Sequence, residues 1–170
     1  MNLKDKIRSV MNYPKEGIDF KDITPVLSDP VAFKACIDQM SALADGREVD
    51  IVVGTEARGF IVGAPLALEL GTGFVPVRKP GKLPSETISH EYELEYGTDT
   101  VEIHKDAIKK GDKVIIVDDL LATGGTAIAS AKLVEELGGE VVGMIFFIEL
   151  EFLEARKLLK DYDIKSLVKF

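Results

Sequence analysis

Short apolar runs alternate with helically spaced segments along most of this 170-residue chain. Runs rich in β-branched residues predict buried strands, and they cover 50–54, 74–78, 113–117, 141–148 and 164–168. Apolar positions three or four residues apart predict helices, and these cover 3–11, 30–43, 60–70, 125–137 and 151–159. Strands that alternate with helices indicate an α/β fold with a mostly parallel sheet covered on both faces.

Three stretches interrupt this alternation. Residues 80–89 contain two prolines and several small polar residues, which predicts a long mobile loop of the kind that is usually functional. Residues 91–96 and 100–103 alternate around Gly97 and predict a hairpin. Residues 18–27 are expected to be irregular or extended. The chain length predicts one domain that spans 1–170.

The composition is that of a soluble globular protein, with 46% apolar and 29% charged residues. A net charge of −8 argues against binding to nucleic acid or to an anionic membrane. The single cysteine, Cys36, excludes an internal disulfide and is expected in the core. The start of the chain lacks a signal-like apolar stretch, and the apolar run at 141–148 is too short to span a bilayer. We therefore expect a cytoplasmic protein.

The most specific motif covers residues 114–127, where a buried strand leads into two acids and a small-residue turn. Asp118 and Asp119 are expected at the carboxyl edge of the sheet, which is where open α/β sheets bind ligands. Residues 122–126 offer backbone N–H groups and hydroxyls at a helix N-terminus, a favourable phosphate site. The segment matches neither a Walker A loop nor a dinucleotide fingerprint. It predicts a ligand that carries a phosphate, with sugar hydroxyls or a metal nearby.

Two further segments carry groups that suit anions. Residues 54–60 read Gly-Thr-Glu-Ala-Arg-Gly-Phe and place Arg58 in a loop after a strand, either as an exposed turn residue or as an anion ligand. Arg78, Lys79 and Lys82 lie close together in an otherwise acidic chain, either as a solvated turn or as the site of an anionic partner.

The run Val-Asp-Asp-Leu-Leu-Ala-Thr-Gly-Gly-Thr resembles the phosphoribosyl-diphosphate binding motif of type I phosphoribosyltransferases, in the form found in adenine-specific members. The resemblance implies their fold, with a flexible hairpin loop at about 79–97 and a small N-terminal hood at about 1–30. It also implies that Asp118 and Asp119 contact the ribose hydroxyls. The residues implied to hold the 5-phosphate are Ala122, Thr123, Gly124, Gly125 and Thr126.

The same resemblance implies a diphosphate site and an acid/base group. The diphosphate ligands are Glu56, Ala57, Arg58, Gly59, Arg78, Lys79 and Lys82. The segment Tyr-Glu-Leu-Glu-Tyr-Gly at 92–97 matches a family motif in which the second Glu exchanges a proton with the purine. That residue is Glu95, with Tyr96 beside it, and Arg58 is the third implied catalytic residue because it binds the leaving diphosphate.

The implied base site lies at residues 17–25. Phe20 is expected to stack on adenine opposite Leu120, and the backbone around Asp19 and Lys21 to read the Watson–Crick edge. Many relatives have Arg where this chain has Lys21. The substitution is minor if the backbone recognises the base, and important if the side chain does, because Lys is not equivalent to Arg.

The implied reaction converts adenine and 5-phosphoribosyl 1-diphosphate to AMP and diphosphate in purine salvage. Magnesium is expected to enter on the sugar diphosphate rather than in a protein cage, and the family implies a homodimer. Two alternatives stay open. One is a 6-oxopurine enzyme for hypoxanthine, guanine or xanthine, which residues 17–25 would have to distinguish. The other is a non-catalytic regulator that senses the sugar diphosphate.

Overall fold

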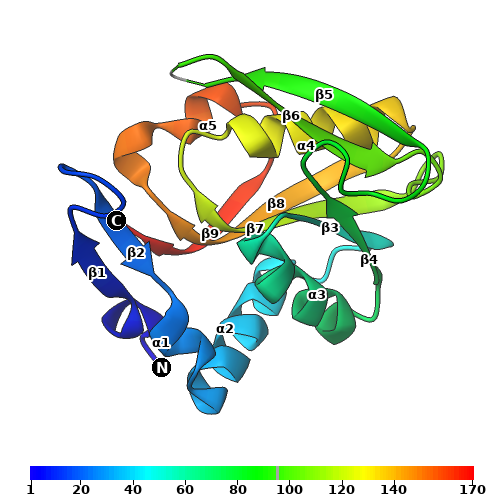
Figure 1. Cartoon of the computed structure of the whole chain (residues 1–170). Helices are drawn as coiled ribbons and strands as arrows, with labels where there is room; N and C mark the ends of the chain where they lie inside the picture. The colour runs from blue at the N-terminus through cyan, green and yellow to red at the C-terminus, as the bar shows by residue number, and fades with distance from the viewer. Residues whose placement is uncertain (95) are drawn as a thin grey trace.

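A computed structural model describes residues 1–94 and 96–170 (Figure 1). Within them, a five-stranded sheet has the order β4-β3-β7-β8-β9, and every neighbouring pair is parallel. Its strands are β3 (Ile51–Thr55), β4 (Gly73–Val77), β7 (Lys113–Leu121), β8 (Glu140–Glu149) and β9 (Ile164–Lys169). The predicted parallel α/β sheet is confirmed.

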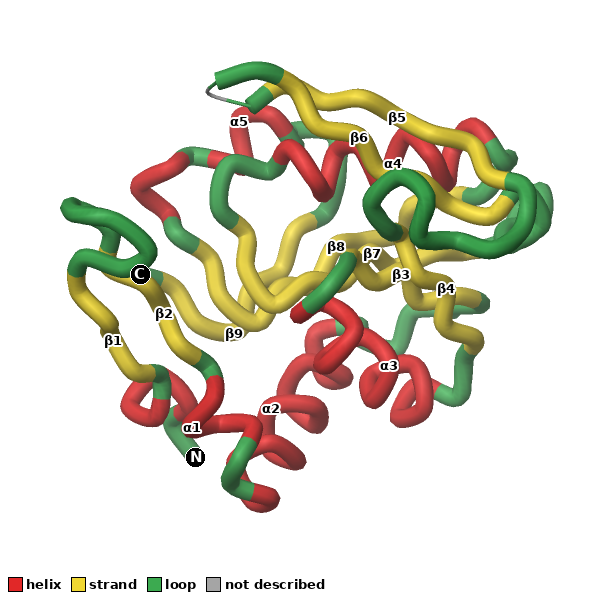
Figure 2. Tube along the Cα trace, in the orientation of Figure 1, coloured by secondary structure: helices red, strands yellow, loops and turns green. Residues whose placement is uncertain are grey.

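Both faces of the sheet are covered, as Figure 2 shows. Helices α2 (Pro30–Leu43) and α3 (Arg58–Leu70) pack on one face, and α4 (Gly125–Glu136) packs on the other. Successive residues of a strand point to opposite faces, so Ile115 and Val117 join the first core while Val114 and Ile116 join the second. This double burial explains why β7 is apolar throughout its first half.

The N-terminal segment differs from the helix expected at 3–11. Only Leu3–Lys6 is helical, as a 3-10 turn, and β1 (Arg8–Met11) pairs antiparallel with β2 (Asp19–Asp22). The apolar spacing at 3–11 fits a helix, but residues 8–11 form a strand because they pair with residues 19–22. The sequence pattern of residues 19–22 did not identify them as a strand. Between β2 and α2, the short helix α1 (Thr24–Leu27) was also missed.

Helix α2 begins at residue 30, as predicted, directly after a capping residue. The Asp29 side chain accepts hydrogen bonds from Val31 N and Ala32 N, and Pro30 occupies the first helical position. Helix α3 ends as expected at Gly71, whose φ of 69° is a left-handed conformation that suits glycine. Cys36 is buried in the α2 core, as expected.

A second antiparallel pair lies over α4 and is formed by β5 (Thr87–Glu93) and β6 (Thr98–His104). The predicted hairpin is confirmed, but its strands are longer than expected and take up the last part of the predicted loop at 80–89. Pairing runs from Thr87 with His104 to Glu93 with Thr98, so the whole hairpin is one ladder.

The helix predicted at 151–159 is broken. Residues Glu151–Leu153 form a 3-10 turn, Glu154 adopts a φ of 54°, and α5 covers only Ala155–Leu158. The left-handed residue turns the chain back toward the sheet, and continuous helical spacing cannot reveal such a turn.

Helix α3 offers a matched test of this packing. Leu66 is 0% exposed in the core beneath the sheet, whereas Leu68 in the same helix is 83% exposed. We expect Leu66→Ala to lower the free energy of unfolding by about 2–5 kcal/mol and Leu68→Ala to change it by less than about 0.5 kcal/mol. Urea denaturation of both variants measures this difference, and equal losses would contradict the orientation of α3.

Candidate functional site

The candidate site lies where β3 and β7 part at the carboxyl edge of the sheet. β3 makes its last pair with β7 between Gly54 and Val117, while β7 continues beside β8 as far as Leu121. The two acids were expected just after the strand, but both lie inside it. The reason is that β8 continues to pair with β7 after the β3 ladder has ended at Val117, so the two acids extend the strand beyond its β3 neighbour.

Asp118 is fixed by three close neighbours. The Thr55 hydroxyl donates to Asp118 Oδ2, and the backbone N–H of Asp119 donates to Oδ1 at 2.8 Å. A Cβ atom on Gly59 would lie only 2.7 Å from Asp118 Oδ1. Glycine is therefore required at residue 59, because any side chain would displace the carboxylate.

Two adjacent carboxylates in one buried site repel each other. Asp119 is 4% exposed, and its Oδ2 lies 3.0 Å from Arg58 Nε. Burial raises the pKa of Asp118 well above its ordinary value, and the charge of Asp119 raises it further. Burial also raises the pKa of Asp119, against the lowering effect of Arg58. The pair therefore gains from any ligand that donates hydrogen bonds to it.

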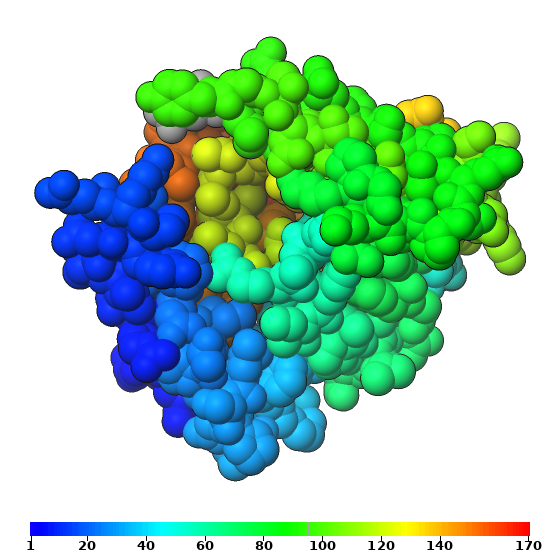
Figure 3. Space-filling model, viewed as in Figure 1, coloured from blue at the N-terminus to red at the C-terminus, as the bar shows by residue number. Residues whose placement is uncertain are grey.

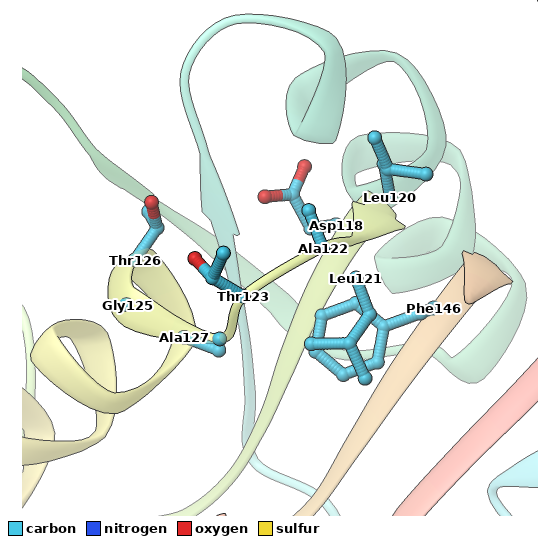
Figure 4. A pocket seen from close by; sticks show the side chains of 10 residues that line it. Asp118, Leu120, Leu121, Ala122, Thr123, Gly125, Thr126, Ala127 and Phe146 are labelled. Carbon is cyan, nitrogen blue, oxygen red and sulfur yellow. The ribbon is translucent and has the colours of Figure 1, made fainter. Parts of the chain in front are cut away.

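The turn from β7 into α4 forms a small hollow of about 80 Å³. Gly124 has a φ of 90° and caps the helix, so the first N–H groups of α4 have no partner within the helix and face the turn. Figure 4 shows the side chains of Asp118, Thr123 and Thr126 on one side of the turn, with Leu121 and Phe146 on the other. The geometry suits an anion with polar groups beside it.

The β5–β6 hairpin packs against the turn between β7 and α4. A Cβ atom on Gly125 would lie 2.9 Å from Tyr92 Cδ2, and the Thr126 hydroxyl donates to Tyr92 Oη at 3.3 Å. Tyr92 Oη also accepts from Lys79 Nζ at 3.2 Å, and Lys79 forms an ion pair with Asp99. Sequence reasoning missed Tyr92 and Asp99, because nothing in a hairpin pattern indicates which polar residue faces another element.

The loop after β3 and the basic segment after β4 are joined by Glu56. Its carboxylate accepts from Lys79 N and from an Arg78 guanidinium nitrogen at 3.1 Å. The peptide bond between Glu56 and Ala57 is cis, and Ala57 is exposed. Lys82 is exposed, and its carbonyl oxygen accepts from Arg78 at 3.5 Å. Glu56 thus joins Arg78 and Lys79 to the loop after β3, whereas the Arg58 side chain pairs with Asp119.

The N-terminal β1–β2 pair places Phe20 beside Arg58. The Arg58 guanidinium lies 5.1 Å from the centre of the Phe20 ring, and Tyr13 packs edge-on against that ring at 5.2 Å. A hollow of about 270 Å³ is lined by Val10, Tyr13, Phe20 and Asp22. Figure 3 shows a deep hollow between the N-terminal segment, the hairpin and the start of α3. Tyr13 was not among the predicted site residues.

Lys21 points away from the face that carries Phe20. Its Nζ donates to Ser9 Oγ at 2.8 Å and to Asp19 Oδ2 at 2.7 Å, and it lies 4.2 Å from the centre of the Phe170 ring. The Lys21 side chain therefore fastens the hood to the end of the chain. Leu120 is half-buried at the end of β7.

Glu95 lies outside the described residues, so its predicted role stays a prediction. Its neighbour Tyr96 is 86% exposed.

Among residues 1–94 and 96–170, no group of three or more acidic, His or Cys side chains is placed to hold a metal ion. Within the same residues, no helix is long and apolar enough to cross a membrane.

Comparisons with known proteins agree on the family. A family profile for the phosphoribosyl transferase domain matches residues 26–169. An adenine phosphoribosyltransferase of Alkaliphilus metalliredigens is 62% identical over 170 residues, which cover 100% of both chains. The structure of adenine phosphoribosyltransferase from Thermoanaerobacter pseudethanolicus has a TM-score of 0.97 at 62% identity, covering 99% of this chain and 98% of that one.

A more distant structure also matches. Adenine phosphoribosyltransferase from Saccharomyces cerevisiae, complexed with an imino-altritol bisphosphate and adenine, has a TM-score of 0.91 at 44% identity, covering 97% of this chain and 96% of that one. The chain belongs to the phosphoribosyltransferase family and, within it, to the adenine phosphoribosyltransferases. The predicted type I phosphoribosyltransferase fold is confirmed.

The buried carboxylates predict a gain in stability when one is neutralised. The pKa of Asp118 is higher in the folded than in the unfolded chain, so stability falls as pH rises through the folded pKa. We expect Asp118→Asn to raise the free energy of unfolding by on the order of 1 kcal/mol at about pH 8 and to change little at about pH 3.

Urea denaturation at both pH values measures this effect. Asp161→Asn is the matched control, because Asp161 is exposed and far from the pair in sequence. A variant at residue 118 that is less stable than the wild type at about pH 8 would contradict the proposed repulsion.

Proposed function

We propose that this chain transfers the phosphoribosyl group of 5-phosphoribosyl 1-diphosphate to adenine, giving AMP and diphosphate in purine salvage. The observation that carries the proposal is the juxtaposition of the Asp118–Asp119 pair with the anion-binding turn at 122–126. The relatives that match the whole chain at about 60% identity are named for this reaction. Neither alternative, a 6-oxopurine enzyme or a non-catalytic regulator, is favoured by these relatives.

The substrate is held at two ends. Ala122, Thr123, Gly124, Gly125 and Thr126 bind the 5-phosphate through backbone N–H groups and hydroxyls. Asp118 and Asp119 accept hydrogen bonds from the ribose hydroxyls. When the bond to diphosphate breaks, positive charge develops on the sugar, and the two carboxylates stabilise it.

The leaving diphosphate is bound by the two segments that Glu56 joins. Arg58 and Lys82 supply positive charge, and Ala57 and Gly59 shape the loop. Glu56 holds the Arg78 guanidinium and the backbone N–H of Lys79. Arg58 faces Asp119 here and has to turn from that carboxylate to the diphosphate. Magnesium arrives on the sugar diphosphate and neutralises part of its charge.

Adenine lies between Phe20 and Leu120, and the backbone around Asp19 and Lys21 reads its Watson–Crick edge. The orientation of the Lys21 side chain, away from Phe20, supports recognition through the backbone. The yeast relative is complexed with adenine. Glu95, with Tyr96 beside it, exchanges the purine proton as the ring nitrogen becomes nucleophilic.

The larger arrangement is also proposed from the family. Residues 1–30 act as a hood over adenine, and residues 79–97 act as a loop that excludes water from the reacting sugar. The chain forms one domain, works as a homodimer in the cytoplasm, and takes neither nucleic acid nor membrane as a partner. A net charge of −8 supports the last point.

Product analysis tests the reaction directly. Purified protein with Mg²⁺ and phosphoribosyl diphosphate is expected to convert adenine to AMP, with kcat/KM at least about 100-fold above that for hypoxanthine or guanine, because an oxo edge leaves the site's polar groups unpaired. Chromatography of the nucleotides measures both. Preference for an oxopurine would favour the alternative enzyme, and the absence of any nucleotide would favour the regulator.

Glu95→Ala tests the acid/base assignment. Loss of a positioned proton carrier is expected to lower kcat by about 100-fold or more, while the KM for phosphoribosyl diphosphate changes little. Steady-state kinetics with each substrate varied measures the two effects. Glu93→Ala is the control, since Glu93 is exposed on the same hairpin. Equal kcat values for the two variants would remove Glu95 from the reaction.

A further inference from the structure

A buried acidic residue lies at the end of β8, outside the set of residues assigned to the substrates. The Glu149 side chain is 3% exposed, yet it carries a full set of partners. Arg156 Nε and a second guanidinium nitrogen of Arg156 donate to its two oxygens at 2.7 and 2.8 Å, and Ser166 Oγ donates at 2.6 Å. Such a two-point contact fixes both distance and orientation.

The arginine side of this pair is also held in place. The third guanidinium nitrogen of Arg156 donates to the carbonyl oxygen of Ile164 in β9 at 3.1 Å. The Arg156 hydrogen bonds lower the pKa of Glu149 in spite of its burial, so the pair is ionised at neutral pH. Arg156 therefore ties α5 to β8 and β9 at once.

Two residues near Arg156 in sequence, Ala155 and Leu159, pack against the turn proposed to bind phosphate. Ala155 and Leu159 are both buried in the core beneath α4. A Cβ atom on Gly124 would lie 3.3 Å from Ala155 Cβ and 3.3 Å from Leu159 Cδ1. The turn at 122–126 thus rests on α5 from behind, while Tyr92 packs on Gly125 from the side of the hairpin.

We propose that the Glu149–Arg156 pair is a positioning device for phosphate binding: it sets the position of α5 against the sheet, and α5 in turn sets the position of Gly124 and the first N–H groups of α4. This inference rests on the proposed function, in which those N–H groups hold the 5-phosphate. Glu149 and Arg156 do not themselves touch the substrate.

The proposal predicts which kinetic constant changes. A shift of the turn by a fraction of an ångström weakens several aligned hydrogen bonds to one phosphate together. Phe20 and Leu120, which form the base site, belong to β2 and β7 rather than to α5. Loss of the pair is therefore expected to weaken binding of the sugar phosphate and to leave the KM for adenine nearly unchanged.

Arg156→Met is the variant that tests this. We expect the Kd of ribose 5-phosphate, measured by isothermal titration calorimetry, and the KM of phosphoribosyl diphosphate to rise at least about tenfold, with kcat and the KM of adenine within about twofold. Arg156→Lys keeps a cation but loses the two-point contact, so we expect an intermediate Kd. It serves as the second variant if Arg156→Met folds poorly.

Arg47→Met is the matched control. Arg47 makes a more exposed ion pair at the other end of β8, where it donates to Val142 O at 2.6 Å and to Asp163 Oδ2 at 2.7 Å. We expect it to lower the free energy of unfolding without raising the Kd of ribose 5-phosphate. Hydrogen exchange of the Ile128 N–H, which donates to Gly124 O at 2.9 Å, is expected to quicken in Arg156→Met and not in Arg47→Met.

The outcomes separate this proposal from the proposed function. A wild-type Kd in both variants of Arg156, an equal rise in Arg47→Met, or an equal rise in the KM of adenine would each overturn the positioning role. A wild-type protein that makes no AMP and does not bind ribose 5-phosphate would instead overturn the proposed function, and this proposal with it.

Discussion

The close placement of two carboxylates inside the last part of the central strand is the constraint on which the site depends. Asp118 and Asp119 are adjacent, largely withdrawn from solvent and raised in pKa by burial. The Thr55 hydroxyl and the Arg58 guanidinium compensate only part of this cost. The protein therefore keeps an unfavourable arrangement that a ligand with hydroxyl groups relieves, as expected of functional sites.

The backbone around the two acids is closely packed at three glycines. Gly59 approaches Asp118, Gly124 rests on α5, and Gly125 lies under Tyr92, so a side chain at any of the three would move the site. Support comes from elements far apart in sequence: the hairpin packs on the turn at 122–126 from one side, and the Glu149–Arg156 pair holds α5 on the other. Binding groups on short loops thereby gain the rigidity of the sheet.

The parallel sheet was predictable because its signals are local. The apolar run before Asp118 and Asp119 marked the central strand and its carboxyl edge, and the helical spacing marked the start of α2 at residue 30 and the end of α3 at residue 70. The secondary-structure predictions were wrong where contacts with residues distant in sequence determine the conformation. Residues 8–11 pair with β2 instead of forming a helix, and Glu154 turns the chain at a left-handed residue. Tyr92 and Asp99 gain their roles only from the packing of the hairpin on α4.

The central claim is a division of labour, in which the turn at 122–126 holds the phosphate and the two acids hold the sugar hydroxyls. Calorimetric titration of ribose 5-phosphate and of inorganic phosphate into the wild type and the Asp118→Asn, Asp119→Asn double variant tests it most directly. The account predicts that the double variant binds ribose 5-phosphate at least about tenfold more weakly while its affinity for inorganic phosphate does not fall. An equal loss for both ligands, or no loss for either, would contradict it.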